Sequence, residues 1–262
     1  MSRIDATFER LGDAGRGGLI TYTTAGDPDA ETSLKVLASI DGAGADVLEV
    51  GVPFSDPLAD GPVIQRATER ALAAGMTLRG VLDLVRLARE EIDTPIVLFI
   101  YANPILRMGT DVFAHAAAEA GVDGVLVLDY PVEEAVAWRR TLVSADLDPI
   151  LLVSPTTTDD RIRQSAQLGR GFLYVISRLG VTGARDDLAE GTGEFLARVR
   201  QQAGLPLALG FGISRPEQVA EACRHADAAV VGSALVDVIA RDERSSAAER
   251  AGDYVRWLKS AL

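Results

Sequence analysis

Eight short runs of β-branched and aliphatic residues, each followed by a segment with helical periodicity, constrain the fold of this chain most. Such alternation is typical of β–α units on a parallel sheet. The predicted strands span residues 19–24, 46–51, 96–101, 124–129, 150–154, 172–177, 207–210 and 228–231. The predicted helices span residues 30–42, 63–74, 78–91, 112–120, 133–144, 159–168, 194–203 and 216–224, with a last helix near the end of the chain. With no Gly/Ser-rich linker, these units predict an α/β fold: a single (β/α)8 TIM barrel with extra helices, one domain over residues 1–262.

Composition and charge narrow the class of protein. The 262 residues are 48% hydrophobic and 24% charged, which is typical of a globular chain. The net charge of −12 argues against nucleic-acid binding. No apolar run reaches the roughly 18 residues of a membrane span, and no secretory signal is visible. Cys223 is the only cysteine, which excludes an intramolecular disulfide, and we expect it to be a small buried residue on a helix. We expect a cytoplasmic enzyme or binding domain without a membrane partner.

The second predicted strand carries a carboxylate. Period-two alternation over residues 46–51 places Glu49 on one face and Leu48 and Val50 on the other. The apolar face should pack against helices, so Glu49 should point into the barrel mouth, where burial raises its pKa toward neutrality. Such a group suits general acid–base catalysis, and an internal ion pair with an arginine is the alternative.

The loop after that strand contains three prolines and two further acids, Asp56 and Asp60. The prolines stiffen the loop, and Pro62 is well placed to open the next helix. Both acids therefore lie near the end of the barrel where β–α loops carry chemistry. A turn or helix-cap role is the alternative for each.

Three glycine clusters follow the last predicted strands, at residues 180–183, 210–214 and 232–234. Glycine allows backbone N–H groups to approach an anion, and helix N-termini favour negative charge. Because lysines are limited to Lys35 and Lys259, these clusters predict a phosphate site made of backbone amides. Ordinary β–α turns are the alternative.

The stretch from Glu49 to Pro62, EVGVPFSDPLADGP, resembles the signature of tryptophan synthase alpha subunits. The resemblance continues through residues 24–28, 101–105 and 177–183 and the Gly210 and Gly232 clusters, and so covers essentially the whole chain. It implies a lyase that cleaves indole-3-glycerol phosphate to indole and glyceraldehyde 3-phosphate by a retro-aldol reaction, in the last steps of L-tryptophan biosynthesis.

The resemblance also implies roles for individual residues. Glu49 would be the acid–base, Asp60 would accept the indole N–H, and Tyr174 would lie near the reacting centre. The expected substrate-binding residues are Tyr22 and Ile100 around the indole, Thr182 on a mobile loop that contacts Asp60, and Gly183, Gly212, Gly232 and Ser233 at the phosphate. The loop, residues 178–191, is longer than a usual β–α connection, which favours a lid.

No metal and no cofactor are implied on this chain, because pyridoxal phosphate is expected only on a partner beta subunit in an alpha2-beta2 heterotetramer. Asp129 and Tyr130 would lie at the contact with that subunit, and Tyr130 departs from the small apolar residue usual there. Two alternatives stay open: another phosphate-handling barrel, such as an isomerase or aldolase, and a non-catalytic partner of the beta subunit. A Schiff-base aldolase would need a lysine on a strand, and neither Lys35 nor Lys259 stands on one of the predicted strands.

Overall fold

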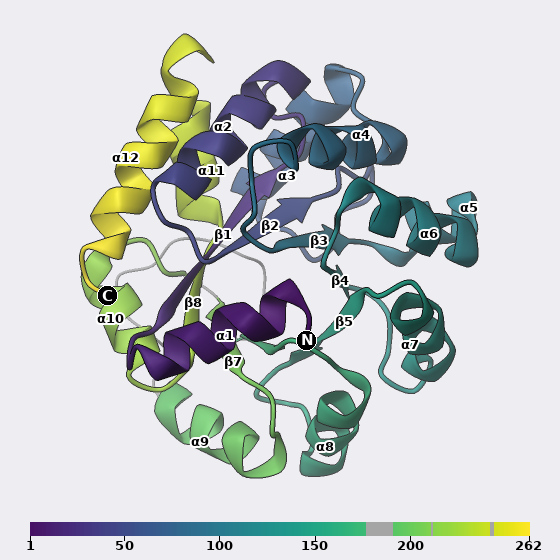
Figure 1. The fold of residues 1–262 in the computed structure, drawn as a ribbon, viewed down its shortest axis with the longest axis vertical. Helices are drawn as coiled ribbons and strands as arrows, with labels where there is room; N and C mark the ends of the chain where they lie inside the picture. Colours follow the sequence, from purple (N-terminus) through teal and green to yellow (C-terminus); the bar gives the residue numbers. More distant parts are fainter. Residues whose placement is uncertain (177–190, 211, 242–243) are drawn as a thin grey trace.

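Eight parallel strands close into one barrel, as predicted (Figure 1). The computed structural model describes residues 1–176, 191–210, 212–241 and 244–262. The strands pair in chain order, and the last pairs with the first. They are β1 (Gly18–Thr24), β2 (Val47–Gly51), β3 (Ile96–Ile100), β4 (Gly124–Val127), β5 (Asp148–Val153), β6 (Leu173–Ile176), β7 (Leu207–Gly210) and β8 (Ala228–Val231).

The helices that follow the strands cover the outside of the barrel. They are α2 (Ala30–Gly42), α3 (Pro62–Ala73), α4 (Leu78–Ala88), α5 (Ala102–Met108), α6 (Thr110–Ala120), α7 (Ala135–Ser144), α8 (Asp159–Leu168), α9 (Thr192–Gln202), α10 (Pro216–Cys223), α11 (Ser233–Ala240), the 3-10 turn η1 (Arg244–Ser246) and α12 (Ala247–Lys259). The sequence did not predict the short helices α5 and α11 as separate elements. None of the described helices is long and apolar enough to cross a membrane.

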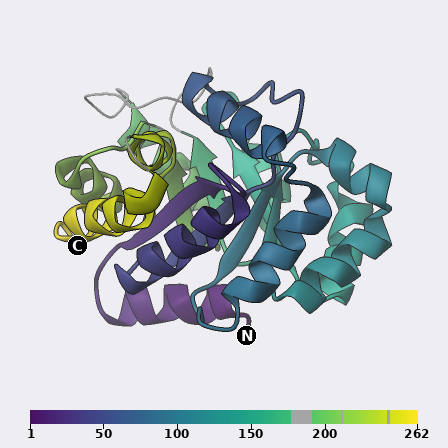
Figure 2. The same ribbon diagram turned by 90° about the horizontal axis from the view of Figure 1, so that it is seen from above.

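Helix α1 (Arg3–Asp13), also missed from the sequence, closes the end of the barrel where the strands begin (Figures 1 and 2). Ser2 and Asp5 form a capping box that starts the helix. Ile4 and Phe8 are buried on its inner face, and Phe8 packs against Phe172 with ring centroids 5.5 Å apart. Chemistry that needs an open face is therefore confined to the opposite, C-terminal end of the strands.

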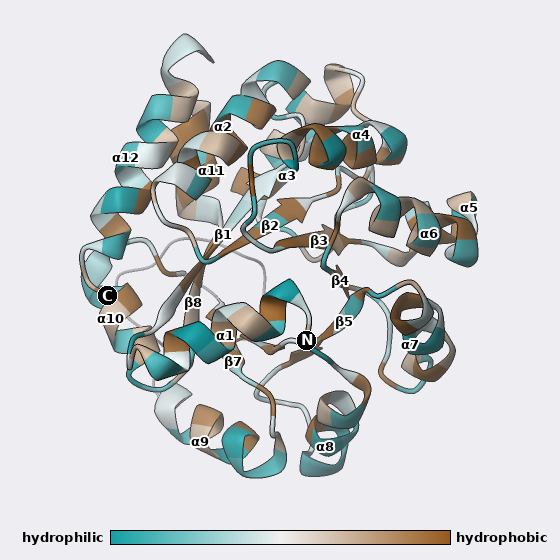
Figure 3. Cartoon of the chain, viewed as in Figure 1, coloured by the Kyte–Doolittle hydropathy of each residue, from teal (hydrophilic) through white to brown (hydrophobic). Residues whose placement is uncertain are grey.

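The core has two layers, because alternate strand residues point to opposite sides. In Figure 3, β2 and β3 are coloured mostly as hydrophobic, as expected for buried strands. The inner cluster fills the barrel and consists of Ile4, Phe8, Leu11, Ile20, Val47, Val97, Leu126, Ile150, Phe172, Ala208, Ala228 and Val230. The outer cluster lies between strands and helices and includes Leu48 and Val50. Val47 and Leu48 thus point in opposite directions, which sets the orientation of the next residue, Glu49.

Candidate active site

Glu49 is two residues beyond Val47 on the inner face of β2, so it points into the barrel, as predicted. It is fully buried, and neither carboxyl oxygen has a hydrogen-bond partner among the described residues. Burial raises its pKa to about 8. No cation in the described ranges forms an ion pair with it, which counts against a purely structural internal salt bridge. The carboxyl is therefore protonated at neutral pH and available to a substrate.

Three aromatic residues, Tyr22, Phe99 and Tyr174, lie near Glu49 on the inner face of the barrel. Tyr22 pairs in register with Glu49 on the neighbouring strand. Phe99 joins the other two rings: its centroid lies 5.2 Å from that of Tyr22 and 6.2 Å from that of Tyr174. Together they form an apolar wall around the carboxyl, which is the environment that keeps it uncharged.

Two glycines make room for the tyrosines of this wall. A Cβ added at Gly51 would lie 2.1 Å from the Tyr22 hydroxyl oxygen, and one at Gly210 would lie 2.4 Å from that of Tyr174. Both distances are far inside van der Waals contact, so larger residues would force the rings to move. Gly51 and Gly210 therefore allow Tyr22 and Tyr174 their positions in the aromatic wall.

Asp60 lies at the end of the loop that joins β2 to α3, and only 5% of its surface is exposed. The Tyr101 hydroxyl donates a hydrogen bond to Asp60 Oδ2 at 3.2 Å and accepts one from the Ala59 N–H at 3.0 Å. Burial raises the pKa of Asp60 to about 6, and the bond from Tyr101 partly opposes that shift. The group is therefore mostly ionised at neutral pH while Glu49 is protonated. Opposite protonation states in one site are typical of acid–base enzymes.

Both carboxyl groups lie near enough to Tyr22 to influence its pKa. Burial first, and then the charge of Asp60, raise the pKa of Tyr22, with a smaller contribution from Glu49. Burial and then the charge of Glu49 raise the pKa of Tyr174. Both phenols are therefore protonated and can only act as neutral hydrogen-bonding groups. Tyr22 makes one long contact, 3.4 Å from its hydroxyl oxygen to Thr24 Oγ1.

The prediction that Ile100 lines the indole site is wrong by one position along β3. Ile100 is fully buried in the outer cluster, together with Leu98, and so points away from Glu49. Phe99 points inward instead, because successive strand residues alternate between the two faces. Tyr101 is a second site residue that the sequence did not reveal. A phenol at the last position of a predicted strand was the available signal, but its bond to Asp60 joins residues 41 positions apart.

The proposed phosphate residues meet at the ends of the neighbouring strands β7 and β8. Gly210 pairs with Val230, so Gly212 and Gly232 each lie two residues beyond this pair. Gly212 has a φ of +83°, a conformation that favours glycine. Gly232 is the N-cap of α11 and Ser233 is its first residue, both partly accessible.

This helix N-terminus adjoins the aromatic wall at Tyr22. An added Cβ at Gly232 would lie 3.5 Å from the Tyr22 Cβ. The helix end can bind an anion through backbone N–H groups and the helix dipole. Thr182 and Gly183 fall outside the described residues, as does the predicted lid up to residue 190.

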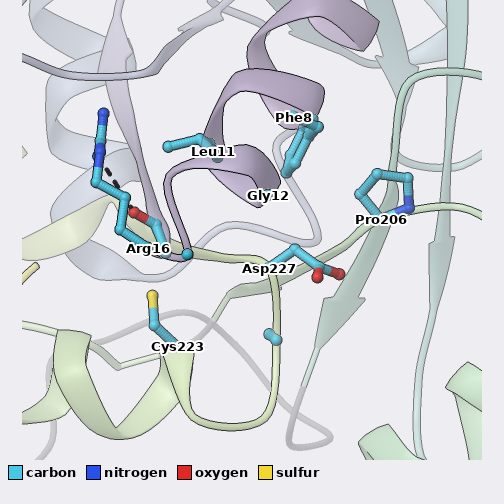
Figure 4. A pocket seen from close by; sticks show the side chains of 10 residues that line it. Phe8, Leu11, Gly12, Arg16, Pro206, Cys223 and Asp227 are labelled. Atoms are coloured by element: carbon cyan, nitrogen blue, oxygen red, sulfur yellow. Dashed lines mark hydrogen bonds between the residues drawn. The ribbon is translucent and has the colours of Figure 1, made fainter.

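A cleft of about 280 Å³ at the opposite end of the barrel offers no comparable chemistry (Figure 4). Arg16 and Asp227, which line it, already serve structural contacts: Arg16 pairs with Asp46, and Asp227 accepts the Leu207 N–H at 2.7 Å. Cys223, also in its wall, has a pKa raised by burial to about 11. The thiol is therefore un-ionised at neutral pH, and Cys223, the last residue of α10, is half-buried rather than fully buried as expected.

Comparisons with known proteins agree with this geometry. Residues 8–261 match the family model described as tryptophan synthase alpha chain. A tryptophan synthase alpha chain of Methylibium petroleiphilum is 47% identical over all of this chain and 97% of its own length. That of Dechloromonas aromatica is 49% identical over 94% of this chain and 92% of its own length.

Solved structures give the same result. The tryptophan synthase subunit alpha of Legionella pneumophila superposes with a TM-score of 0.89 at 39% identity, covering 100% of this chain and 98% of that one. A chain of Mycobacterium tuberculosis tryptophan synthase superposes with a TM-score of 0.91 at 35% identity, covering 100% and 98%. The chain therefore belongs to the tryptophan synthase alpha chain family, whose members cleave indole-3-glycerol phosphate to indole and glyceraldehyde 3-phosphate.

Proposed function

We propose that this chain cleaves indole-3-glycerol phosphate with Glu49 as the acid–base and Asp60 as the partner of the indole nitrogen. The observation that carries the assignment is the fully buried Glu49, whose pKa is raised to about 8 beside a second carboxyl that titrates near 6. A protonated acid and a carboxylate in one pocket are what a retro-aldol cleavage of an indole ring requires.

In the proposed mechanism, the Glu49 carboxyl gives its proton to C3 of the indole. The ring becomes a cation in which the bond from C3 to the side-chain carbinol carbon can break. As it breaks, its electron pair restores the aromatic ring, and the carbinol hydroxyl becomes the aldehyde of glyceraldehyde 3-phosphate. The hydroxyl proton goes to the Glu49 carboxylate, so the enzyme ends in its starting state.

Asp60 stabilises the positive charge that develops on the indole N–H, an interaction that is strongest in the transition state. Tyr101 orients the carboxylate through its hydrogen bond to Oδ2. Tyr174 lies beside Glu49 in the inner layer and packs against the reacting centre. We assign Thr182 to the contact with Asp60 when substrate is bound, as the family resemblance implies.

The phosphate group is assigned to the amides around Gly212, Gly232 and Ser233, with Gly183 as a further contact. The N-terminus of α11 borders Tyr22, so a substrate anchored there would present its indole to the aromatic wall. This arrangement needs no lysine, in keeping with a chain that has only two.

The proposed chemistry uses only acid–base groups of this chain, so a metal or cofactor on it is not part of the proposal. Pyridoxal phosphate is assigned to a beta subunit, with which this chain would form an alpha2-beta2 complex in the cytoplasm. The overall reaction of that complex would make it a carbon–oxygen lyase, whereas the step on this chain breaks a carbon–carbon bond.

The activity of the chain is expected to follow a bell-shaped dependence on pH. Asp60 must be ionised, so kcat/KM should rise as the pH passes its pKa of about 6, and Glu49 must be protonated, so kcat/KM should fall as the pH passes about 8. Initial rates of indole formation across this range test the assignment. A profile without a fall on the alkaline side would contradict Glu49 as the proton donor.

The surface proposed for the beta subunit lies beside α5 and the residues after β4. Leu106 is 60% exposed although it is apolar, and it lines a shallow pocket with Tyr130 and Trp138. Asp129, which the resemblance places at the same contact, is exposed and accepts the Ala102 N–H at 2.7 Å, which fixes the start of α5. Apolar side chains that remain exposed near a functional face favour a protein contact.

Leu106→Asp is therefore expected to weaken binding of a tryptophan synthase beta subunit by at least about 10-fold, because it would place a charge in the contact. Leu87→Asp on α4, where the leucine is 44% exposed, is the matched control and should bind normally. Titration calorimetry with purified beta subunit measures both. Equal affinities for the two variants would remove Leu106 from the interface.

A further inference from the structure

The main chain of Asp60 is held by a side chain of the following helix. Gly61 is the N-cap of α3, and the Gln65 N–H donates to the Gly61 carbonyl at 2.9 Å as a regular helical bond. The Asp60 carbonyl, one residue earlier, accepts the side-chain amide of Gln65 at 2.8 Å instead. Gln65 thus binds two consecutive carbonyl groups and fixes the peptide that joins the carboxylate residue to the helix.

Helix α3 itself is fixed by contacts away from Asp60. Ile64 packs into a cluster with Tyr22 and Val236, which fixes the face that borders the aromatic wall. In the last turn, Arg70 Nε and Nη2 donate to the two oxygens of Asp27 at 2.7 and 2.8 Å. Such a bidentate pair has a defined geometry. The helix can therefore hold Gln65 in place whether or not Asp60 is bound to it.

The hydrogen bond from Gln65 to the Asp60 carbonyl is important because a glycine, Gly61, follows Asp60. Gly61 has no Cβ and restricts the backbone less than any other residue type. A small rotation of the peptide after Asp60 would swing its carboxylate away from the Tyr101 hydroxyl, which lies 3.2 Å from Oδ2. The Asp60 N–H donates to the Pro57 carbonyl at 3.0 Å, which holds the residue on its N-terminal side. The Gln65 amide holds the carbonyl on the other side and so restrains this rotation.

We propose that Gln65 is a positioning residue for catalysis: its amide locks the Asp60 carbonyl so that the carboxylate stays directed at the indole nitrogen. The proposal rests on the role assigned to Asp60 above. Gln65 itself does not touch the reacting atoms. Its contribution should therefore appear in kcat and disappear when the carboxylate is absent.

Gln65→Met keeps the length of the side chain and removes the donor. We expect kcat for indole-3-glycerol phosphate to fall about 5- to 10-fold, the value of one neutral hydrogen bond, with the affinity for inorganic phosphate unchanged. Arg66→Gln, an exposed position on the same helix, is the control and should keep parental turnover. Thermal unfolding of both variants shows whether the fold is intact.

Gln65→Glu separates positioning from packing, because a carboxyl can donate to the Asp60 carbonyl only while it is protonated. The turnover of Gln65→Glu relative to Gln65→Met is expected to rise as the pH falls from about 6 to about 4, through the usual glutamate pKa of about 4.3. A merely structural effect would leave that ratio constant across the range, and a constant ratio would overturn the proposal.

A double-mutant cycle with Asp60→Asn distinguishes failure of this proposal from failure of the assigned function. If Gln65 acts through Asp60, Gln65→Met should cause no further loss in the Asp60→Asn background. Full activity of Asp60→Asn would refute the role of Asp60 and with it the positioning role. Two other results would refute only the role of Gln65, given a deficient Asp60→Asn variant. One is a fully active Gln65→Met variant, and the other is a double variant in which the losses of the two single substitutions add.

Discussion

Glu49→Gln is expected to lower kcat by at least about 100-fold, because the amide keeps the shape of the side chain but cannot transfer a proton. The apparent affinity for substrate should change far less, since the phosphate and the indole nitrogen are assigned to other groups. Indole release by the purified chain, followed under saturating indole-3-glycerol phosphate, measures the effect. A variant that retained most of its turnover would exclude Glu49 as the acid–base.

Asp56→Asn is the matched control for this substitution. Asp56 is an exposed acid of the loop that follows β2, and its carboxylate accepts a hydrogen bond from the Ser55 hydroxyl at 2.6 Å. It has no part in the proposed chemistry, so its loss should leave kcat close to the parental value. Equal losses in the two variants would indicate a general electrostatic effect rather than proton transfer.

Stability provides a second readout for Glu49→Gln. The folded pKa of about 8 lies above the usual value of 4.5, so the native state binds the extra proton between these limits. The contribution of Glu49 to the free energy of unfolding is fully present below the usual pKa of 4.5. It is lost as the pH rises toward the folded pKa of about 8. Because glutamine does not ionise, the variant should gain stability relative to the parent from acid to alkaline pH, by up to roughly 5 kcal/mol at about 1.4 kcal/mol per pKa unit.

The fold could be predicted from the sequence because each β–α unit carries its own local pattern. The range predicted for α2, residues 30–42, agrees at both ends, since Asp29 caps the helix through the Thr32 N–H and the apolar pattern stops at Gly42. Helix α1 was missed because it precedes the first strand and follows no β–α repeat. Its apolar residues Ile4, Phe8 and Leu11 have helical spacing that could have revealed it.

The site was predictable only as far as it depends on strand periodicity or on the family resemblance. Alternation around Glu49 gave the correct face, and the same rule applied to β3 would have selected Phe99 in place of Ile100. The contacts of Tyr101 and Gln65 with Asp60 depend instead on how separate elements pack in three dimensions. No local pattern encodes which phenol or amide will reach a loop carboxylate.

A mutational test of the phosphate site requires a glycine whose substitution does not itself strain the backbone. Gly212 does not meet this condition, because its φ of +83° disfavours any larger residue. Gly232 has a φ of −117°, and an added Cβ would make only ordinary contacts, the nearest at 3.5 Å. It is also the N-cap of α11, a position at which Asp and Asn are both favourable.

Gly232→Asp is accordingly expected to keep the fold while weakening substrate binding by at least about 30-fold. Its carboxylate would occupy the amides at the N-terminus of α11 and would repel the phosphate group, and about 2 kcal/mol of such repulsion corresponds to that loss. Titration of indole-3-glycerol phosphate into the Glu49→Gln background measures affinity without turnover. Gly232→Asn, nearly identical in shape and able to cap the same helix, isolates the charge and should lose much less affinity. If both variants bound substrate as tightly as the Gly232 parent, the phosphate would have to be held elsewhere.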